Sequence, residues 1–176
     1  MYEQLGGFQV RRGRFAPGDA GTYQTLALMR RLAMEGSRRV DVREAAISIV
    51  REAGVPPHEP LGELRALYDF VRDRVRFTRD ADGIEVLQGP HYTLHILAGD
   101  CDDRAILLAA LAKAIGIPAE FKFRVIGANP RVPGAFSHVY VVAKLGGREI
   151  PMDPTYAENP IGFEHPHPSR VGELTI

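Results

Sequence analysis

The chain has 176 residues, which suits one domain with a sizeable core. Apolar residues make up 45% and charged residues 25%, and the 22 basic residues balance the 22 acidic ones, so overall charge gives no reason to expect binding to nucleic acid or to a membrane surface. No apolar run approaches membrane-spanning length, and the first fifteen residues lack the charged-then-apolar order of a secretory signal. The single cysteine excludes an internal disulfide and fits a reducing compartment.

Helices are predicted first along the chain. The first twenty residues, rich in Gly and Arg, are expected to form an N-terminal arm, and the remainder, 21–176, is expected to form a single domain. Apolar residues recur at three- and four-residue spacing in three segments, which predicts amphipathic helices over 22–35, 41–53 and 64–75. Asp41 and Glu44 have the spacing of a capping box, and Gly54 is a typical helix stop.

Residues 79–90 are a turn-rich connection. Asp80, Asp82 and Gly83 have the spacing that opens a calcium-binding loop, but the later ligands of such a loop are missing. We therefore interpret this segment as a plain turn.

The segment GDCDDRAILLAALAKAIGIP, which begins at Gly99, is the most informative part of the chain. Residues 106–115 are apolar nearly all the way round, which is typical of a helix in the middle of a domain. Gly116 is expected to end this helix, and Asp100 is expected to cap its first turn. The only cysteine, Cys101, is thereby placed at the N-terminus of a buried helix.

Strands are expected after this helix. Residues 119–126 alternate between apolar and polar side chains, as in a half-buried strand, and residues 138–145 and 148–153 flank Gly146-Gly147 as in a tight hairpin. The segment after Pro160 is rich in Pro and His and is expected to be irregular. Helices, one buried central helix and then antiparallel strands predict an α+β fold with the sheet packed on the helix.

Cys101 is a candidate nucleophile, although a lone cysteine is usually a small buried hydrophobe. The free N–H groups and the dipole of a helix N-terminus favour the thiolate, and the same groups could hold an oxyanion. Gly99 would let a substrate approach closely. Asp102 and Asp103 oppose ionisation of the thiol, so Cys101 needs a partner base. The two carboxylates themselves are typical of a first helical turn; alternatively, one of them orients a substrate or holds a positively charged loop.

The hairpin supplies that base. A two-residue turn at Gly146-Gly147 collects apolar side chains on one face and places Tyr140 opposite Asp153 on the other. His138 and Asp153 are then diagonal neighbours, roughly 7–8 Å apart at the backbone. Judged alone, each is equally typical of a strand end. Because a carboxylate on one imidazole nitrogen leaves the other free for a thiol proton, we expect Cys101, His138 and Asp153 to form a catalytic triad.

Several motifs resemble the transglutaminase-like superfamily. They are GDCDD with an apolar helix ending in AIGIP, then SHVYV, then MDPT; IEVLQGP and LYDFVRDRVRF are similar to small transglutaminase-like proteins of bacteriophages and prophages. The resemblance covers about 25–155. It implies a papain-like α+β fold with a catalytic core at about 61–156, in which Cys101 is the nucleophile, His138 the general base and acid, and Asp153 its orienter.

The resemblance also implies a reaction. Members attack a carboxamide or peptide carbonyl, form a thioester and pass the acyl group to an amine or to water, with no metal or organic cofactor. We therefore expect a protein or peptide substrate with a glutamine or other amide group, water or an amine as acceptor, and a cytoplasmic or virion-associated location. The larger animal enzymes hold the oxyanion with an upstream Trp, which this chain lacks. Gln88 is the nearest upstream amide donor, and its side chain and the backbone N–H of Cys101 are the candidate oxyanion donors.

Other hypotheses stay open at this point. One is a cysteine protease of the same fold, and another is a non-catalytic phage structural or assembly protein that keeps the fold. A third is a zinc site, because His91 and His95 stand four residues apart and could share a helix face. They lack the intervening Glu of a zinc protease and a clear third ligand, which favours polar residues without a metal.

Overall fold

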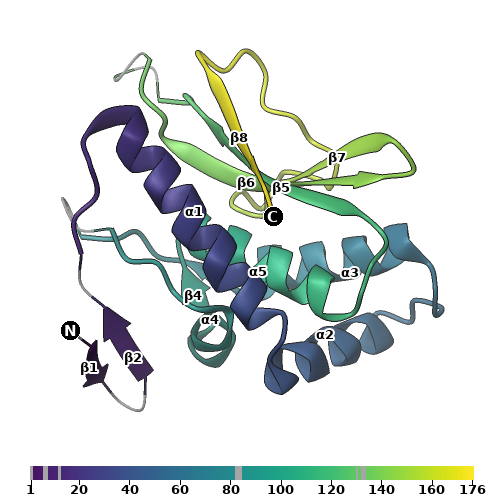
Figure 1. The fold of residues 1–176 in the computed structure, drawn as a ribbon. Helices are drawn as coiled ribbons and strands as arrows, with labels where there is room; N and C mark the ends of the chain where they lie inside the picture. Colours follow the sequence, from purple (N-terminus) through teal and green to yellow (C-terminus); the bar gives the residue numbers. More distant parts are fainter. Residues whose placement is uncertain (1, 6–7, 12, 82–84, 130, 132–133) are drawn as a thin grey trace.

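A computed structural model describes residues 13–81, 85–129, 131 and 134–176, and the backbone of 2–5 and 8–11. Figure 1 shows a four-stranded sheet lying on one side of a group of helices, with α5 between the sheet and the outer helices. The elements are β1 (Tyr2–Leu5), β2 (Phe8–Arg11), α1 (Gly18–Gly36), α2 (Val40–Glu52), α3 (Pro60–Arg74), β3 (Arg76–Phe77), α4 (Pro90–Ile96), β4 (Ala98–Gly99), α5 (Cys101–Ala114), β5 (Glu120–Ile126), β6 (His138–Leu145), β7 (Arg148–Met152) and β8 (Val171–Thr175). Among the described helices, none has the length and apolar character needed to cross a bilayer.

The first three helices follow the predicted apolar periodicity, with one correction. α1 begins a turn earlier than expected, at Gly18, and α2 ends before Gly54, whose φ of 69° suits a helix stop. The capping box predicted at Asp41 is wrong, because the N-cap of α2 is Arg39, two residues earlier, and Arg39 makes no side-chain cap hydrogen bond. Asp41 instead accepts two hydrogen bonds from the Arg39 guanidinium, at 2.9 and 2.8 Å.

α5 is the central element of the fold, as predicted. It contacts α1, α2, α3, α4 and β6, and every residue from Asp102 to Ala112 is buried. Its apolar surface therefore has a neighbour in every direction, which explains why the segment lacks a polar face. This packing fixes the N-terminal end of α5, and with it Cys101, against the start of β6.

The main sheet has the strand order β7-β6-β5-β8, and every pair is antiparallel. The predicted hairpin register is confirmed, since Val141 pairs with Met152. Gly146 and Gly147 have φ values of 57° and 82°, which a two-residue turn of this hand requires. Apolar side chains of the inner face, such as Val141, join the core formed with α5.

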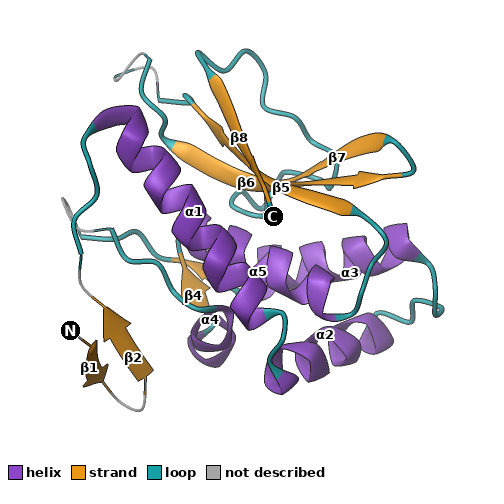
Figure 2. Cartoon of the chain, viewed as in Figure 1, coloured by secondary structure: helices purple, strands orange, loops and turns teal. Residues whose placement is uncertain are grey.

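The end of the chain differs from the prediction. The segment after Pro160 was expected to be irregular, but residues 171–175 form β8, which pairs with β5. Because β7 and β8 lie on opposite edges of the sheet, residues 153–170, which we call the crossing segment, run over the outer face (Figure 2). This face is therefore covered, and Tyr140 and Val142 of β6 are fully buried although they lie on the face opposite to α5.

Candidate active site

His138 and Asp153 lie together at the end of the hairpin. His138 begins β6, Asp153 directly follows β7, and His138 Nε2 is 2.8 Å from Asp153 Oδ2. Both side chains are buried. Because a carboxylate only accepts hydrogen bonds, His138 Nε2 carries the hydrogen of this bond, and Nδ1 is the nitrogen left to face a second partner.

The loop that carries Asp153 is held from three sides. The Thr155 N–H donates to Asp153 Oδ1 at 3.0 Å, and the Tyr68 hydroxyl of α3 lies 2.8 Å from the Asp153 carbonyl oxygen, to which it donates. The buried guanidinium of Arg104, on α5, donates to the carbonyl oxygens of Pro154, at 2.5 Å, and Thr155. These contacts fix the backbone on which the carboxylate turns.

A second histidine shares the carboxylate of Asp153. His165, in the crossing segment, has its Nε2 2.6 Å from the same Oδ2. Burial opposes ionisation of Asp153, but the hydrogen bonds from His138 and His165 outweigh it and hold the pKa of this carboxyl well below its usual value. No signal in the sequence singled out His165 beyond the abundance of His in its segment.

Cys101 is the first residue of α5, at the mouth of a cavity of about 610 Å³. The predicted cap is confirmed: the Asp100 side chain accepts from the N–H groups of Asp102 and Asp103, and the Asp103 side chain accepts from the Asp100 N–H in return. Cys101 and His138 both line the cavity, and Cys101 is half-buried. The structure thus brings the thiol and the imidazole to the same cavity, with Asp153 behind the imidazole.

The surroundings of Cys101 keep its thiol protonated at rest. Burial raises the pKa of Cys101 well above its usual value, and the charges of Asp102 and Asp100 raise it further. The thiol donates to Asp102 Oδ1 at 3.7 Å, and the N–H of Val139 is a weaker influence that lowers the pKa. The stabilisation expected from the helix N-terminus is outweighed, so ionisation of this thiol requires a base.

The carboxyl groups of the first turn of α5 bind protons tightly. Burial raises the pKa of Asp100 to about 6 and that of Asp103 to about 8. Burial, followed by the neighbouring carboxyl of Glu85, raises the pKa of Asp102 well above its usual value. Asp103 also accepts the N–H of Gln88 at 2.7 Å, so it holds the segment before α4 against α5.

Gly99 and Gln88 are two further residues with predicted roles at this site. The role given to Gly99 is wrong, because a Cβ at this position would lie 2.6 Å from the Asp103 Cβ, so the glycine makes room for Asp103 rather than for a substrate. Gln88 accepts from Thr93 Oγ1 at 3.3 Å through its side-chain oxygen, and it is not among the described residues that line the cavity. Its role as an oxyanion donor stays a prediction.

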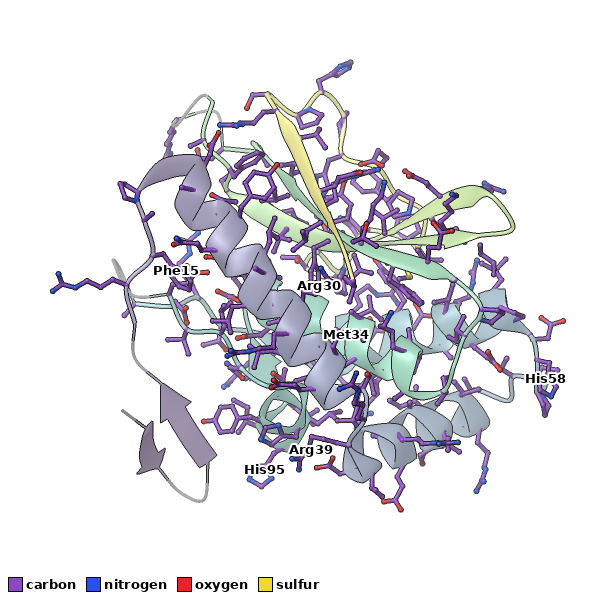
Figure 3. The ribbon with its side chains drawn as sticks, in the orientation of Figure 1. Phe15, Arg30, Met34, Arg39, His58 and His95 are labelled. Atoms are coloured by element: carbon purple, nitrogen blue, oxygen red, sulfur yellow. The ribbon has the colours of Figure 1, made fainter. Side chains whose placement is uncertain are left out.

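The two metal-site motifs considered from the sequence lie in different parts of the molecule. His91 and His95 of α4 line a shallow pocket with Arg39, and Figure 3 shows Arg39 and His95 at the same edge of the molecule. Of the calcium-like motif, Asp82 and Gly83 lie outside the described residues, whereas Asp80 lines the cavity at Cys101.

Within the described ranges, the one group of three close metal-ligand types is His138, Asp153 and His165. Their N–O distances of 2.8 and 2.6 Å are those of hydrogen bonds, whereas ligands of tetrahedral zinc stand about 3.4 Å apart. The group could bind a metal only if both N–H protons were lost and the side chains moved apart.

Comparison with known proteins agrees with this architecture. A candidate cysteine protease from Cytophaga hutchinsonii has a similar structure, with a TM-score of 0.52 and 19% identity over 75% of this chain and 42% of that chain. A candidate protease from Parabacteroides distasonis gives a TM-score of 0.55 and 14% identity over 86% of this chain and 35% of that one, so the present chain spans less than half of either protein. No curated protein sequence matches the chain.

The family comparison is more specific. The model of the transglutaminase-like superfamily matches residues 47–154, which include α3, α5 and the β6–β7 hairpin. The predicted fold class is confirmed by this match together with the mixed helical and antiparallel architecture. The chain belongs to the transglutaminase-like superfamily.

Proposed function

We propose that this protein is a cysteine-dependent enzyme that attacks an amide carbonyl with Cys101 and forms a thioester. The observation that carries the proposal is the shared cavity: its walls include a thiol at a helix N-terminus and an imidazole whose other nitrogen is bound by a buried carboxylate. Superfamily membership supports the same chemistry.

The first half-reaction follows from the positions of the protons. His138 Nδ1 accepts the Cys101 proton as sulfur attacks the carbonyl carbon, and Asp153 stabilises the resulting imidazolium through Nε2. The tetrahedral intermediate then collapses, the C–N bond breaks, and the leaving amine or ammonia takes the proton from His138. The acyl group is left on Cys101 as a thioester.

The second half-reaction regenerates the thiol. His138 removes a proton from water or from a primary amine, which attacks the thioester carbon; the C–S bond breaks and sulfur recovers the proton. Water gives hydrolysis, and an amine gives amide exchange. Both acceptors share every residue of the first step, so the choice depends on which one reaches the thioester.

The oxyanion formed in each step needs donors. The N–H of Cys101 is a suitable one, because the Asp100 cap engages the N–H groups of Asp102 and Asp103 but not this first amide of α5. Gln88 is proposed as the second donor. Alkylation by iodoacetamide passes through no oxyanion, so Gln88→Ala should lower acyl transfer while leaving the alkylation rate of Cys101 unchanged; equal losses in both assays would contradict the role.

The substrate proposed is a protein or peptide that presents a glutamine carboxamide. A specific alternative is cleavage of the peptide bond itself, which is favoured by the similarity of the fold to the two candidate proteases. A non-catalytic assembly role in a bacteriophage is the remaining alternative.

One experiment separates these functions. The protein is incubated with a panel of glutamine-containing peptides and a primary amine, and the products are identified by mass. Amide exchange, deamidation and backbone cleavage give different masses, and each should disappear in Cys101→Ala and His138→Asn while His167→Asn, at an exposed position, keeps activity. No product from any peptide, together with an unchanged rate of Cys101 labelling in His138→Asn, would overturn the proposal in favour of the assembly role.

A further inference from the structure

Asp153 makes more hydrogen bonds than a triad requires. Its Oδ2 accepts from His138 at 2.8 Å and from His165 at 2.6 Å, with Asn159 Nδ2 farther away at 3.5 Å. Oδ1 accepts the N–H of Thr155. The bond from His165 is the shortest of these, and it comes from a segment that a minimal Cys–His–Asp site does not need.

The two imidazoles have different surroundings. His138 lines the cavity with Cys101, whereas His165 is not among the cavity-lining residues that the structure describes. The His165 ring lies 5.2 Å from the His138 ring and 5.3 Å from that of Phe163, both in edge contact, and 5.5 Å from Tyr140. The hydrogen bond that joins His165 to the triad residues is therefore made to Asp153 and not from the cavity.

The chain beside His165 is fixed to the outer face of the sheet. The neighbouring residue, Glu164, accepts hydrogen bonds from the Tyr140 hydroxyl and from Arg124, the latter at 2.5 Å. Arg124 is in turn paired with Glu173 of β8, at 2.7 Å. These contacts set the position of the His165 ring before it meets the carboxylate, so its hydrogen bond to Asp153 needs little further ordering.

We propose that His165 is a positioning residue: its Nε2–H fixes the Asp153 carboxylate in the orientation that His138 requires to serve Cys101. This inference rests on the proposed function and deepens it. Without the second donor, Oδ2 keeps His138 and only a long contact with Asn159, so the carboxylate is freer to turn about its Cα–Cβ–Cγ bonds. A misaligned carboxylate holds the imidazole less well in the tautomer that leaves Nδ1 available.

Two substitutions separate the hydrogen bond from the packing. His165→Phe keeps an aromatic ring among its neighbours but removes the donor, and His165→Gln keeps an N–H donor but loses the ring. The rate of Cys101 alkylation by iodoacetamide should fall about tenfold in H165F, as expected for loss of a hydrogen bond to a charged group, and should return to near the wild-type rate in H165Q. His167→Asn is the control, because this position in the same segment is exposed and asparagine tolerates its φ of 50°; this variant should alkylate as the wild type does.

The pH profile is a readout that packing alone would not move. Loss of the His165 hydrogen bond weakens the support that Asp153 gives to the imidazolium of His138, so the thiol proton of Cys101 is transferred less readily. The alkylation profile should therefore move to higher pH in H165F and not in H165Q. In the described structure, the titratable and charged groups that face Asp153 are His138, His165, Tyr68, Arg104 and Tyr156.

Ring N–H signals of histidine provide a test that is independent of reactivity. Proton NMR of the nitrogen-15-labelled protein should show two protected Nε2–H signals in the wild type and only that of His138, exchanging faster, in H165F. Wild-type alkylation rate and profile in H165F would overturn the inference, and so would an equal loss in H165Q accompanied by an equal fall in thermal stability. If His138→Asn is alkylated at the wild-type rate, the proposed function fails, and the NMR signals still decide whether His165 orders the Asp153–His138 pair.

Discussion

Asp102→Asn tests the electrostatic description of Cys101 most directly. Asp102 Oδ1 accepts the thiol proton at 3.7 Å, and its charge is the largest influence after burial that raises the pKa of Cys101. At about 4 Å, two unit charges repel by about 4 kcal/mol for an effective dielectric constant of 20. A fully charged Asp102 would thus disfavour the thiolate by up to about this amount and raise the pKa of the thiol.

The expected change is smaller than this limit. Burial and the neighbouring carboxyl of Glu85 raise the pKa of Asp102 itself, so the group carries a proton for part of the time and repels the thiolate less. Asparagine keeps the shape of the side chain and removes the charge. We therefore expect the pKa of the thiol to be lower in D102N than in the wild type. The rate of Cys101 alkylation at neutral pH should rise by about tenfold or more, which corresponds to about 1.4 kcal/mol of the limit of about 4 kcal/mol.

The assay is the rate of Cys101 alkylation by iodoacetamide as a function of pH, with thiolate absorbance as a second measure. The control is Asp73→Asn, which removes one charge from an exposed position on α3. The midpoint of the profile should move to lower pH in D102N and stay in place in D73N. An unchanged or higher midpoint in D102N would refute the reasoning, and equal movement in both variants would show an effect of overall charge instead.

Three further predictions concern stability. The raised pKa values of Asp100, about 6, and Asp103, about 8, mean that the folded protein holds protons which the unfolded chain releases near pH 4. The midpoint of urea unfolding should therefore be lower at pH 8 than at pH 5, and an equal or higher midpoint at pH 8 contradicts this. Arg104→Met removes the donors from buried backbone carbonyls and should lower the free energy of unfolding by about 3 kcal/mol, and a loss below about 1 kcal/mol would argue against their importance. Gly99→Ala places a Cβ 2.6 Å from a side-chain carbon of Asp103 and should lower the free energy of unfolding, measured in urea, by about 1–3 kcal/mol. Gly13→Ala, whose Cβ would have no atom within 4 Å, should leave it nearly unchanged, and equal effects of the two variants would contradict the packing explanation.

Local patterns in the sequence predicted the elements that build the site. The nearly continuous apolar stretch 106–115 indicated a central helix, and alternation around Gly146-Gly147 predicted the hairpin register that brings His138 beside Asp153. Both signals depend only on neighbours in the chain, so a single sequence contains them. The cap at Asp100 was predictable for the same reason, since its partners are two and three residues away.

Contacts between distant segments were not predictable in this way. His165 meets Asp153 only because β8 pairs with β5 and draws the crossing segment over the sheet, and no local pattern reports that pairing. The direction of the pKa shift of Cys101 was also not predictable. Burial, which raises this pKa, depends on the whole fold, whereas the helix N-terminus, which favours the thiolate, is a local feature. At Asp41 the local motif misled, since the adjacent Arg39 offered a charged partner that no capping rule includes.

The position of β8 has a consequence for how the molecule responds to disturbance. β8 is an edge strand at the end of the chain, and such strands open more easily than central ones. The crossing segment is attached to β8, so transient opening of that edge increases the mobility of the backbone that positions His165. A mutation or small molecule acting there would disturb the His138–Asp153 pair from the outer face of the sheet, on the side away from Cys101.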